Sequence, residues 1–394
     1  MFHSVHACKH RTVATVLIVA ALASLGIPVA ACPFCGVVGE SLAARRDAAD
    51  CVAVGEADGR AFLNADGALS QRFRIDQVLR GDVPANGEAI IARVSGAANG
   101  TAILFCTTTD AAAPIAVGTW TAIAADEVLL GYIVAAPRLR EAAASRLQWF
   151  AARLEDPNPQ IAQDAFVEFG LASFAAVCEA ADSLDAKKLR VWVNEPGIDQ
   201  RRQGFYGLAL GIVASRSQNT GQATACIHAL HEAIAAPADD FRSGFSGLLA
   251  GVLVAEGERG LDYLKSRGLF EPQARAVDQR HLLAALRFAW ESLADTIPRD
   301  RTSNATAALL VSPAVAADAT IDLARYAFWK PVAAVADLWN TLGTEDPLVR
   351  RAVAGYLSAC PLPAAKRQLE KIRAAQPELW QRALESSALL PEKI

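Results

Sequence analysis

The chain has 394 residues, of which 53% are hydrophobic and 20% are charged, and its formal net charge is −4. This composition excludes general disorder and supplies enough apolar surface for a packed core. The slightly acidic balance and the lack of a basic cluster disfavour nucleic acid and anionic membranes as partners.

The first feature along the chain is an export signal. Lys9 and Arg11 precede an uncharged apolar run over residues 13–25, and small residues lead up to Ala31. A basic start, an apolar stretch and small residues before the cut are typical of a signal peptide. We therefore predict that residues 1–31 are removed between Ala31 and Cys32. The mature chain would then carry a net charge of −6, because the signal holds two bases and no acids.

Two alternatives to cleavage remain open at this end of the chain. The apolar run is long enough to stay in a bilayer as an uncleaved anchor. Residues 29–32 also resemble a degenerate bacterial lipobox, in which Cys32 would be acylated. All three readings predict an exported protein of the periplasm, the outer surface or the medium. No later segment is long and apolar enough to span a membrane, so we expect none after signal removal.

Four cysteines lie in the region after the signal. Cys32 and Cys35 form a Cys-x-x-Cys pair, and Cys51 and Cys106 follow. Outside the reducing cytosol these cysteines are disulfide candidates, and the three possible pairings stay open. A redox-active Cys32/Cys35 pair is the alternative, although this pair follows no predicted strand. A zinc site made of the four cysteines is disfavoured because only one Cys-x-x-Cys pair exists.

Residues 32–136 are predicted to form a small β-barrel domain. Short apolar or alternating runs are separated by Gly, Asn, Asp and Pro, as in a small barrel or sandwich. The predicted strands cover residues 51–55, 69–79, 89–94, 102–106, 119–124 and 128–134.

Residues 137–394 are predicted to be all helical. Leu139, Ala143, Leu147, Phe150 and Leu154 recur at spacings of three and four, which is one face of a helix. Residues 156–159 would end that helix and start the next, over residues 160–169. Further helical patterns continue to the C-terminus, punctuated by prolines.

One internal repeat stands out in the helical region. Residues 204–211 recur as residues 244–251, forty residues later, with five of eight positions identical. A period near forty with two helices per unit is typical of HEAT-like arrays. Gly204, Gly207 and Gly211 fall on one helix face, so we expect a neighbouring helix to approach closely there.

The first half resembles the netrin/TIMP-like fold, an OB-type barrel tied by cysteines to its own N-terminus. The likeness rests on Cys32, Cys35, residues 47–57, residues 73–81 and Cys106. The start departs from the family's Cys-x-Cys, because two residues separate Cys32 from Cys35. The full length resembles a group of exported bacterial proteins in which such a barrel precedes HEAT-like helices. That group has no assigned activity, so the resemblance implies architecture only.

No residue cluster predicts a reaction. His228 and His231 share a helix face with Cys226 and Glu232, but their order is not that of a zinc-protease motif. The isolated cysteines and the seven tryptophans are interpreted as core residues; the cysteines are Cys178, Cys226 and Cys360. We expect no cofactor, no metal and no catalytic residue.

The sequence thus predicts an α+β multidomain protein: a small OB/TIMP-like β-barrel followed by a HEAT-like superhelical array. The leading hypothesis is an exported, non-enzymatic binding or scaffold protein of the cell envelope that binds a protein or peptide through the array. One alternative is a protease-inhibitor-like module acting through the Cys32 segment. The other is a thiol oxidoreductase using Cys32 and Cys35.

Overall fold

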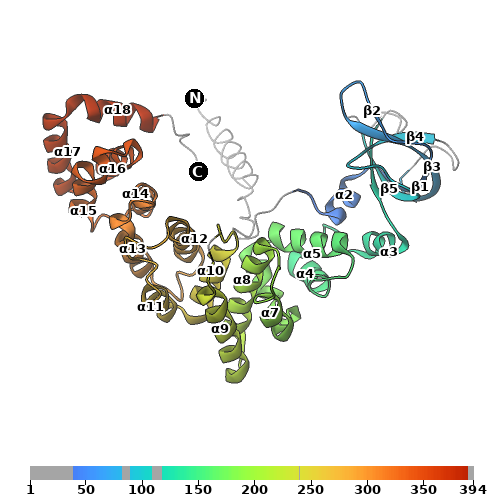
Figure 1. The fold of residues 1–394 in the computed structure, drawn as a ribbon, viewed down its shortest axis with the longest axis horizontal. Coiled ribbons are helices and arrows are strands. Elements are labelled where there is room, and N and C mark those ends of the chain that lie inside the picture. Colours follow the sequence, from blue (N-terminus) through green and yellow to red (C-terminus); the bar gives the residue numbers. More distant parts are fainter. Residues whose placement is uncertain (1–38, 82–88, 109–117, 239, 389–394) are drawn as a thin grey trace, which may run out of the picture.

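The computed structural model describes residues 39–81, 89–108, 118–238 and 240–388. A β-barrel is followed by a curved array of helices, with the barrel at one end of the arc and the last helices at the other (Figure 1). The predicted layout of a small barrel followed by an all-helical part is therefore confirmed. The strands are β1 (Cys51–Ala57), β2 (Phe62–Leu63), β3 (Leu69–Arg80), β4 (Ala89–Val94), β5 (Thr101–Thr107) and β6 (Thr119–Ala124).

Five of these strands close the barrel. Their hydrogen-bonded order is β1-β5-β6-β4-β3, and β1 pairs with β3 to complete the ring, while β2 adds to the side of β3. The β4–β6 pairing is parallel and the other pairings are antiparallel. A five-stranded Greek-key barrel of this kind is the OB type of architecture.

Alternation along the strands divides the barrel's side chains between two cores. On β5, Leu104 and Cys106 point into the barrel interior with Phe73, whereas Ile103 and Phe105 belong to the core that continues into the helices. Successive side chains of a strand face opposite sides, so one strand serves both cores. The outer face of β1 and β5 is thus the base on which the helical array begins.

Two helices that the sequence patterns did not predict flank the barrel. Helix α2 (Leu42–Ala48) precedes β1, and helix α3 (Glu127–Ala135) follows β6. The predicted strand over residues 128–134 is therefore wrong. Asp126 caps α3 by accepting a hydrogen bond from the Leu129 amide, and the helix buries Leu129, Tyr132 and Ile133 at helical spacing. A short apolar run fits both periods, and here the cap decides for the helix.

The array consists of paired helices. Two of them begin with an Asn or Asp cap followed by a proline in the first turn. Asn158 caps α5 with Pro159 in its first turn, and Asp346 caps α16 with Pro347 in the same place. The predicted break over residues 156–159 is confirmed, although α4 is shorter than the predicted face, since it leaves out Leu139 and Leu154. The α-helices are α4 (Ala143–Ala151), α5 (Pro159–Leu171), α6 (Phe174–Glu179), α7 (Ala186–Trp192), α8 (Gln200–Arg216), α9 (Thr220–Ala235), α10 (Phe245–Glu256), α11 (Glu258–Ser266), α12 (Ala276–Ser292), α13 (Arg299–Ala308), α14 (Ala316–Arg325), α15 (Val332–Asp337), α16 (Pro347–Ala359), α17 (Pro363–Ala375) and α18 (Pro377–Ala388).

The glycine repeat lies at a close helix–helix contact at the centre of the array. Gly204 on α8 faces Gly244, the N-cap residue of α10, and Gly247 within α10. Gly211 faces Gly251, so equivalent positions of the repeat meet in register. A Cβ on Gly211 would lie 2.2 Å from the carbonyl oxygen of Gly251. The predicted close approach is confirmed. Residues 204–214 of α8 are all buried, as expected of a helix that is apolar all round.

Candidate anion-binding pocket

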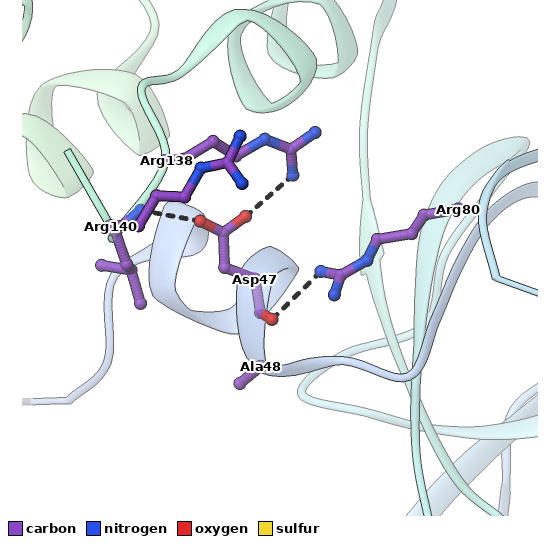
Figure 2. A pocket seen from close by; sticks show the side chains of 6 residues that line it. Asp47, Ala48, Arg80, Arg138 and Arg140 are labelled. Atoms are coloured by element: carbon purple, nitrogen blue, oxygen red, sulfur yellow. Dashed lines mark hydrogen bonds and ion pairs between the residues drawn. The ribbon is translucent and has the colours of Figure 1, made fainter.

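A pocket of about 610 Å³ lies where the barrel meets the first helices (Figure 2). Arg80, at the end of β3, approaches it from the barrel side, and Arg138 and Arg140 approach from the connection between α3 and α4. The residues that line it are Asp47, Ala48, Arg80, Arg138, Leu139 and Arg140. Three arginines therefore face one open, water-accessible space.

Asp47, near the C-terminal end of α2, organises this pocket. Its Oδ1 accepts hydrogen bonds from Arg46 Nε at 2.8 Å and Arg138 Nη1 at 2.9 Å, and its Oδ2 accepts one from the Leu139 amide at 2.8 Å. Burial acts to raise the pKa of Asp47, but the hydrogen bonds from Arg46, Leu139 and Arg138 outweigh it and hold the pKa well below its ordinary value. Asp47 is thus ionised and already engaged.

Arg46, next to Asp47 on α2, is hydrogen-bonded to the C-terminal end of α3. Its side chain is buried, and its Nη1 donates to the carbonyls of Ile133 at 2.7 Å and Ala136 at 2.6 Å, while Nη2 donates to that of Pro137 at 3.1 Å. These carbonyls lie at the C-terminal end of α3, where a helix has no partners of its own for them. One side chain of α2 thereby sets the position of the connection that carries Arg138 and Arg140.

The three pocket arginines differ in how firmly they are held. Arg80 Nη1 donates to the carbonyls of Arg46 and Asp47, both at 3.0 Å, and Arg138 is held by Asp47. Arg140 is exposed and makes no hydrogen bond or ion pair with the residues that the structure describes. The arrangement holds two guanidinium groups in place and leaves a third unengaged beside them.

A buried polar cluster supports the same junction from inside. Asp164 on α5 accepts hydrogen bonds from the Leu42 amide at 2.7 Å and from the Tyr132 hydroxyl at 2.6 Å, so it ties α2 and α3 to α5. Burial raises the pKa of Asp164 to about 6, against the opposing hydrogen bonds from Tyr132 and Leu42. Next to it, Arg146 forms an ion pair with the buried Glu168.

Two of the four predicted disulfide cysteines lie in the described part of the chain. Cys51 on β1 and Cys106 on β5 are directly opposite each other in the antiparallel register and face the barrel interior. Burial raises the pKa of the Cys51 thiol to about 12 and that of Cys106 to about 11. No disulfide joins two cysteines of the described residues. Ala31, Cys32 and Cys35 lie outside the described residues, so the predicted bridges and cleavage stay predictions.

His228 and His231 turn to different partners. His228 pairs with Glu232 at 3.3 Å, whereas His231 turns to Glu256 at 2.7 Å and stacks on the Tyr263 ring. Within the ranges that the structure describes, no three His, Cys, Asp or Glu side chains are arranged to hold a metal ion. In the same ranges, no helix is both long and apolar enough to cross a bilayer.

Most of the isolated cysteines and tryptophans that were predicted to lie in the core are buried or pack against it. Cys226 and Cys360 are buried, and Cys178 is partly buried and packs against the core. Among the tryptophans, Trp120, Trp339 and Trp380 are buried. Trp149, Trp192 and Trp329 pack against the core, and Trp290 stacks on the Tyr326 ring at 4.2 Å.

No pattern in the sequence predicts this pocket. Asp47 and Arg80 belong to stretches that carry the barrel resemblance, but nothing local connects them with Arg138 or Arg140, which lie more than fifty residues away in the chain. The only signal was two arginines, 138 and 140, directly after Pro137 at the end of the barrel region. Comparison with family models, curated proteins and solved structures finds no match to this chain.

Proposed function

We propose that this chain is an exported, non-enzymatic binding or scaffold protein of the cell envelope that binds a protein or peptide through its helical array. The observation that carries the proposal is the curved stack of paired helices that follows the barrel (Figure 1). Repeat arrays of this kind present long surfaces on which extended partners are bound.

The packing of the array supports a preformed surface. One apolar core runs from the outer face of the barrel through the helices to Trp380 near the C-terminus. The glycine contact between α8 and α10 brings two helix backbones close together at its centre. A surface held rigid in this way loses little conformational entropy when a partner binds.

The proposal is tested by site-specific photo-crosslinking of the exported chain in the cell envelope. Crosslinkers are placed at exposed positions on two helix sets: Arg280 on α12 and Leu348 on α16, and Asp262 on α11 and Lys371 on α17. A binding array crosslinks one defined polypeptide from one of the two sets, and the purified pair then forms a complex of measurable affinity. Catalytic turnover by the purified protein that a point mutation abolishes would overturn the proposal.

A second candidate function is protease inhibition through the N-terminus of the mature chain. The closed barrel with Cys51 and Cys106 opposite each other on β1 and β5 favours it, because the netrin/TIMP-like resemblance involves those cysteines. In that fold type a free terminal Cys amine, here that of Cys32, reaches the metal of the protease.

Intact mass and N-terminal peptide mapping of the exported protein, with and without reduction and alkylation, separate these functions. A start at an unmodified Cys32 whose thiol is bridged keeps the inhibitor function, which inhibition of a panel of metalloproteases then supports. An acyl mass on Cys32 excludes it. Reactive thiols at both Cys32 and Cys35 would favour the oxidoreductase instead.

A further inference from the structure

We propose that the pocket formed by Arg80, Arg138 and Arg140 binds the carboxylate groups of an acidic polypeptide segment. The inference rests on the proposed function, because it names the chemistry by which a polypeptide partner is held at the barrel end of the array.

The pocket offers unused hydrogen-bond donors. A guanidinium carries five N–H groups. Arg80 uses Nη1 on two backbone carbonyls and Arg138 uses Nη1 on Asp47, which leaves Nε and Nη2 of each side chain without a partner among the described residues. Arg140 has all five available. Two parallel N–H groups match the two oxygens of a carboxylate, which is why arginine binds this group in a bidentate manner.

The carboxylates already present do not neutralise the pocket. Asp47 accepts hydrogen bonds at both of its oxygens, and Glu141 accepts one from the Arg138 amide at 2.8 Å. Asp50 also interacts electrostatically with Arg80, so four arginines, including the buried Arg46, stand against three carboxylates. The rest of the chain is acidic overall, so this positive region is local and attracts acidic groups over a Debye length of about 8 Å at physiological salt.

Preorganisation favours binding at this place over binding to scattered surface arginines. Arg80 is held by the carbonyls at the end of α2, and Arg138 is held by Asp47, whose own position is fixed by Arg46 and the Leu139 amide. A ligand therefore has to order only Arg140, and the entropy lost on binding is smaller than for three free side chains.

The shape of the pocket favours a chain segment over a single small ion. A volume of about 610 Å³ far exceeds that of one carboxylate, and the pocket is open to solvent rather than enclosed. Its apolar lining is limited to Ala48 and Leu139, which suits a polar segment and not a hydrophobic ligand. Several acidic side chains of one segment fit this combination.

The test measures binding of a labelled twelve-residue peptide of alternating Glu and Gly to the full mature chain by fluorescence anisotropy. The same peptide with Gln for Glu, free succinate and inorganic phosphate are the comparison ligands. The pocket variant is Arg140→Glu, and the matched control is Arg373→Glu on α17, which removes another exposed arginine whose side chain has no partner among the described residues. Thermal melts check that both variants fold.

We expect the Glu peptide to bind, the Gln peptide not to bind, and Arg140→Glu to weaken binding by about tenfold or more, the size of one lost charge-assisted contact. Arg373→Glu should stay within about twofold, and raising the salt to 0.5 M should abolish binding. Equal weakening by both variants would overturn the proposal, because the attraction would then be general. Binding of phosphate or succinate without binding of the peptide would also overturn it.

The failure of this inference is distinguishable from the failure of the proposed function. If the crosslinked partner binds the wild-type chain and Arg140→Glu equally well, the array is a binding surface and the pocket is not its acidic subsite. If no polypeptide partner is crosslinked but the Glu peptide binds with the expected Arg140 dependence, the pocket assignment stands and the proposed role of the array falls.

Discussion

The contact between α8 and α10 and the junction between barrel and array hold the molecule together in opposite ways. The first contact is apolar, with glycines at matching positions that let two backbones meet. The second is polar, since Arg46, Asp47, Asp164 and Tyr132 exchange hydrogen bonds across α2, α3 and α5. Close packing therefore specifies the array locally, whereas directed hydrogen bonds orient the barrel on it.

The largest expected effect comes from filling the glycine contact. Gly211→Ala places a methyl group 2.2 Å from the carbonyl oxygen of Gly251, so the helices must separate. We expect a loss of about 3 kcal/mol or more of unfolding free energy, at the upper end of what overpacking costs. The control is Gly355→Ala on α16, where a Cβ meets nothing within 4 Å. It should gain up to about 1 kcal/mol from helix propensity. Similar urea midpoints for the two variants would contradict the close contact.

The junction is tested by Arg46→Ala. Removing this side chain leaves the carbonyls of Ile133, Ala136 and Pro137 without their donor. It also removes one of the hydrogen bonds that Asp47 accepts. Orphaned buried groups predict a cost of about 3 kcal/mol. Arg46→Lys should recover little of it, since an ammonium group lacks the guanidinium fork. Full recovery by lysine in urea unfolding would show that charge alone matters there.

The pH dependence of the junction follows from Asp164. Its pKa is about 6 in the folded chain, and an unperturbed aspartate titrates near 4. The folded state therefore binds the proton more tightly, so this stabilisation is complete below about pH 4 and is lost as the pH rises through 6. We expect the loss to be about 2–3 kcal/mol.

Asp164→Asn isolates this contribution, because the amide oxygen still accepts from the Leu42 amide but does not titrate. Carboxylates with lowered pKa values, such as Asp47, make stability increase with pH. They do so equally in wild type and variant, so their contribution cancels in the difference. The difference in unfolding free energy between wild type and variant should change between pH 4 and pH 7. If this difference did not change with pH, Asp164 would not be a cause of the pH dependence of stability.

The smallest effect is expected for an exposed ion pair within the array. Arg301 on α13 pairs with Glu258 on α11 at 2.8 Å, and both side chains are about half exposed. Such pairs contribute about 0.2–1 kcal/mol at most, so Arg301→Ala should lower stability by less than 1 kcal/mol, and 0.5 M salt should remove even that. If Arg301→Ala lowered the unfolding free energy as much as Arg46→Ala, solvent exposure would not explain the difference between the exposed ion pair and the buried arginine.

Much of the fold was predictable because its signals are local. The predicted strands over residues 51–55, 69–79, 89–94, 102–106 and 119–124 match β1, β3, β4, β5 and β6 closely. Alternation and turn residues act over a few neighbours, and so do proline and its caps. The glycine repeat was equally visible, because equal spacing on two helices implies a matching face.

The errors and omissions occur where a local pattern is compatible with two structures. Residues 128–134 fit a strand and a helix, and the Asp126 cap with burial against the core decided for α3. Helix α2 is too short for a periodic signal, yet it carries Arg46 and Asp47. The candidate pocket was missed for a different reason, since its residues are far apart in the chain and share no motif.

The order of barrel and helices, most of the strands and the glycine face of α8 could be predicted from the amino-acid sequence alone, because each depends on residues within one element. Only the tertiary structure brought Arg80 next to Arg138 and Arg140, and Cys51 opposite Cys106. Closing the barrel and seating α2 against α3 place residues together that are tens of positions apart. Contacts of that range depend on the whole fold, and no short pattern of residues encodes them.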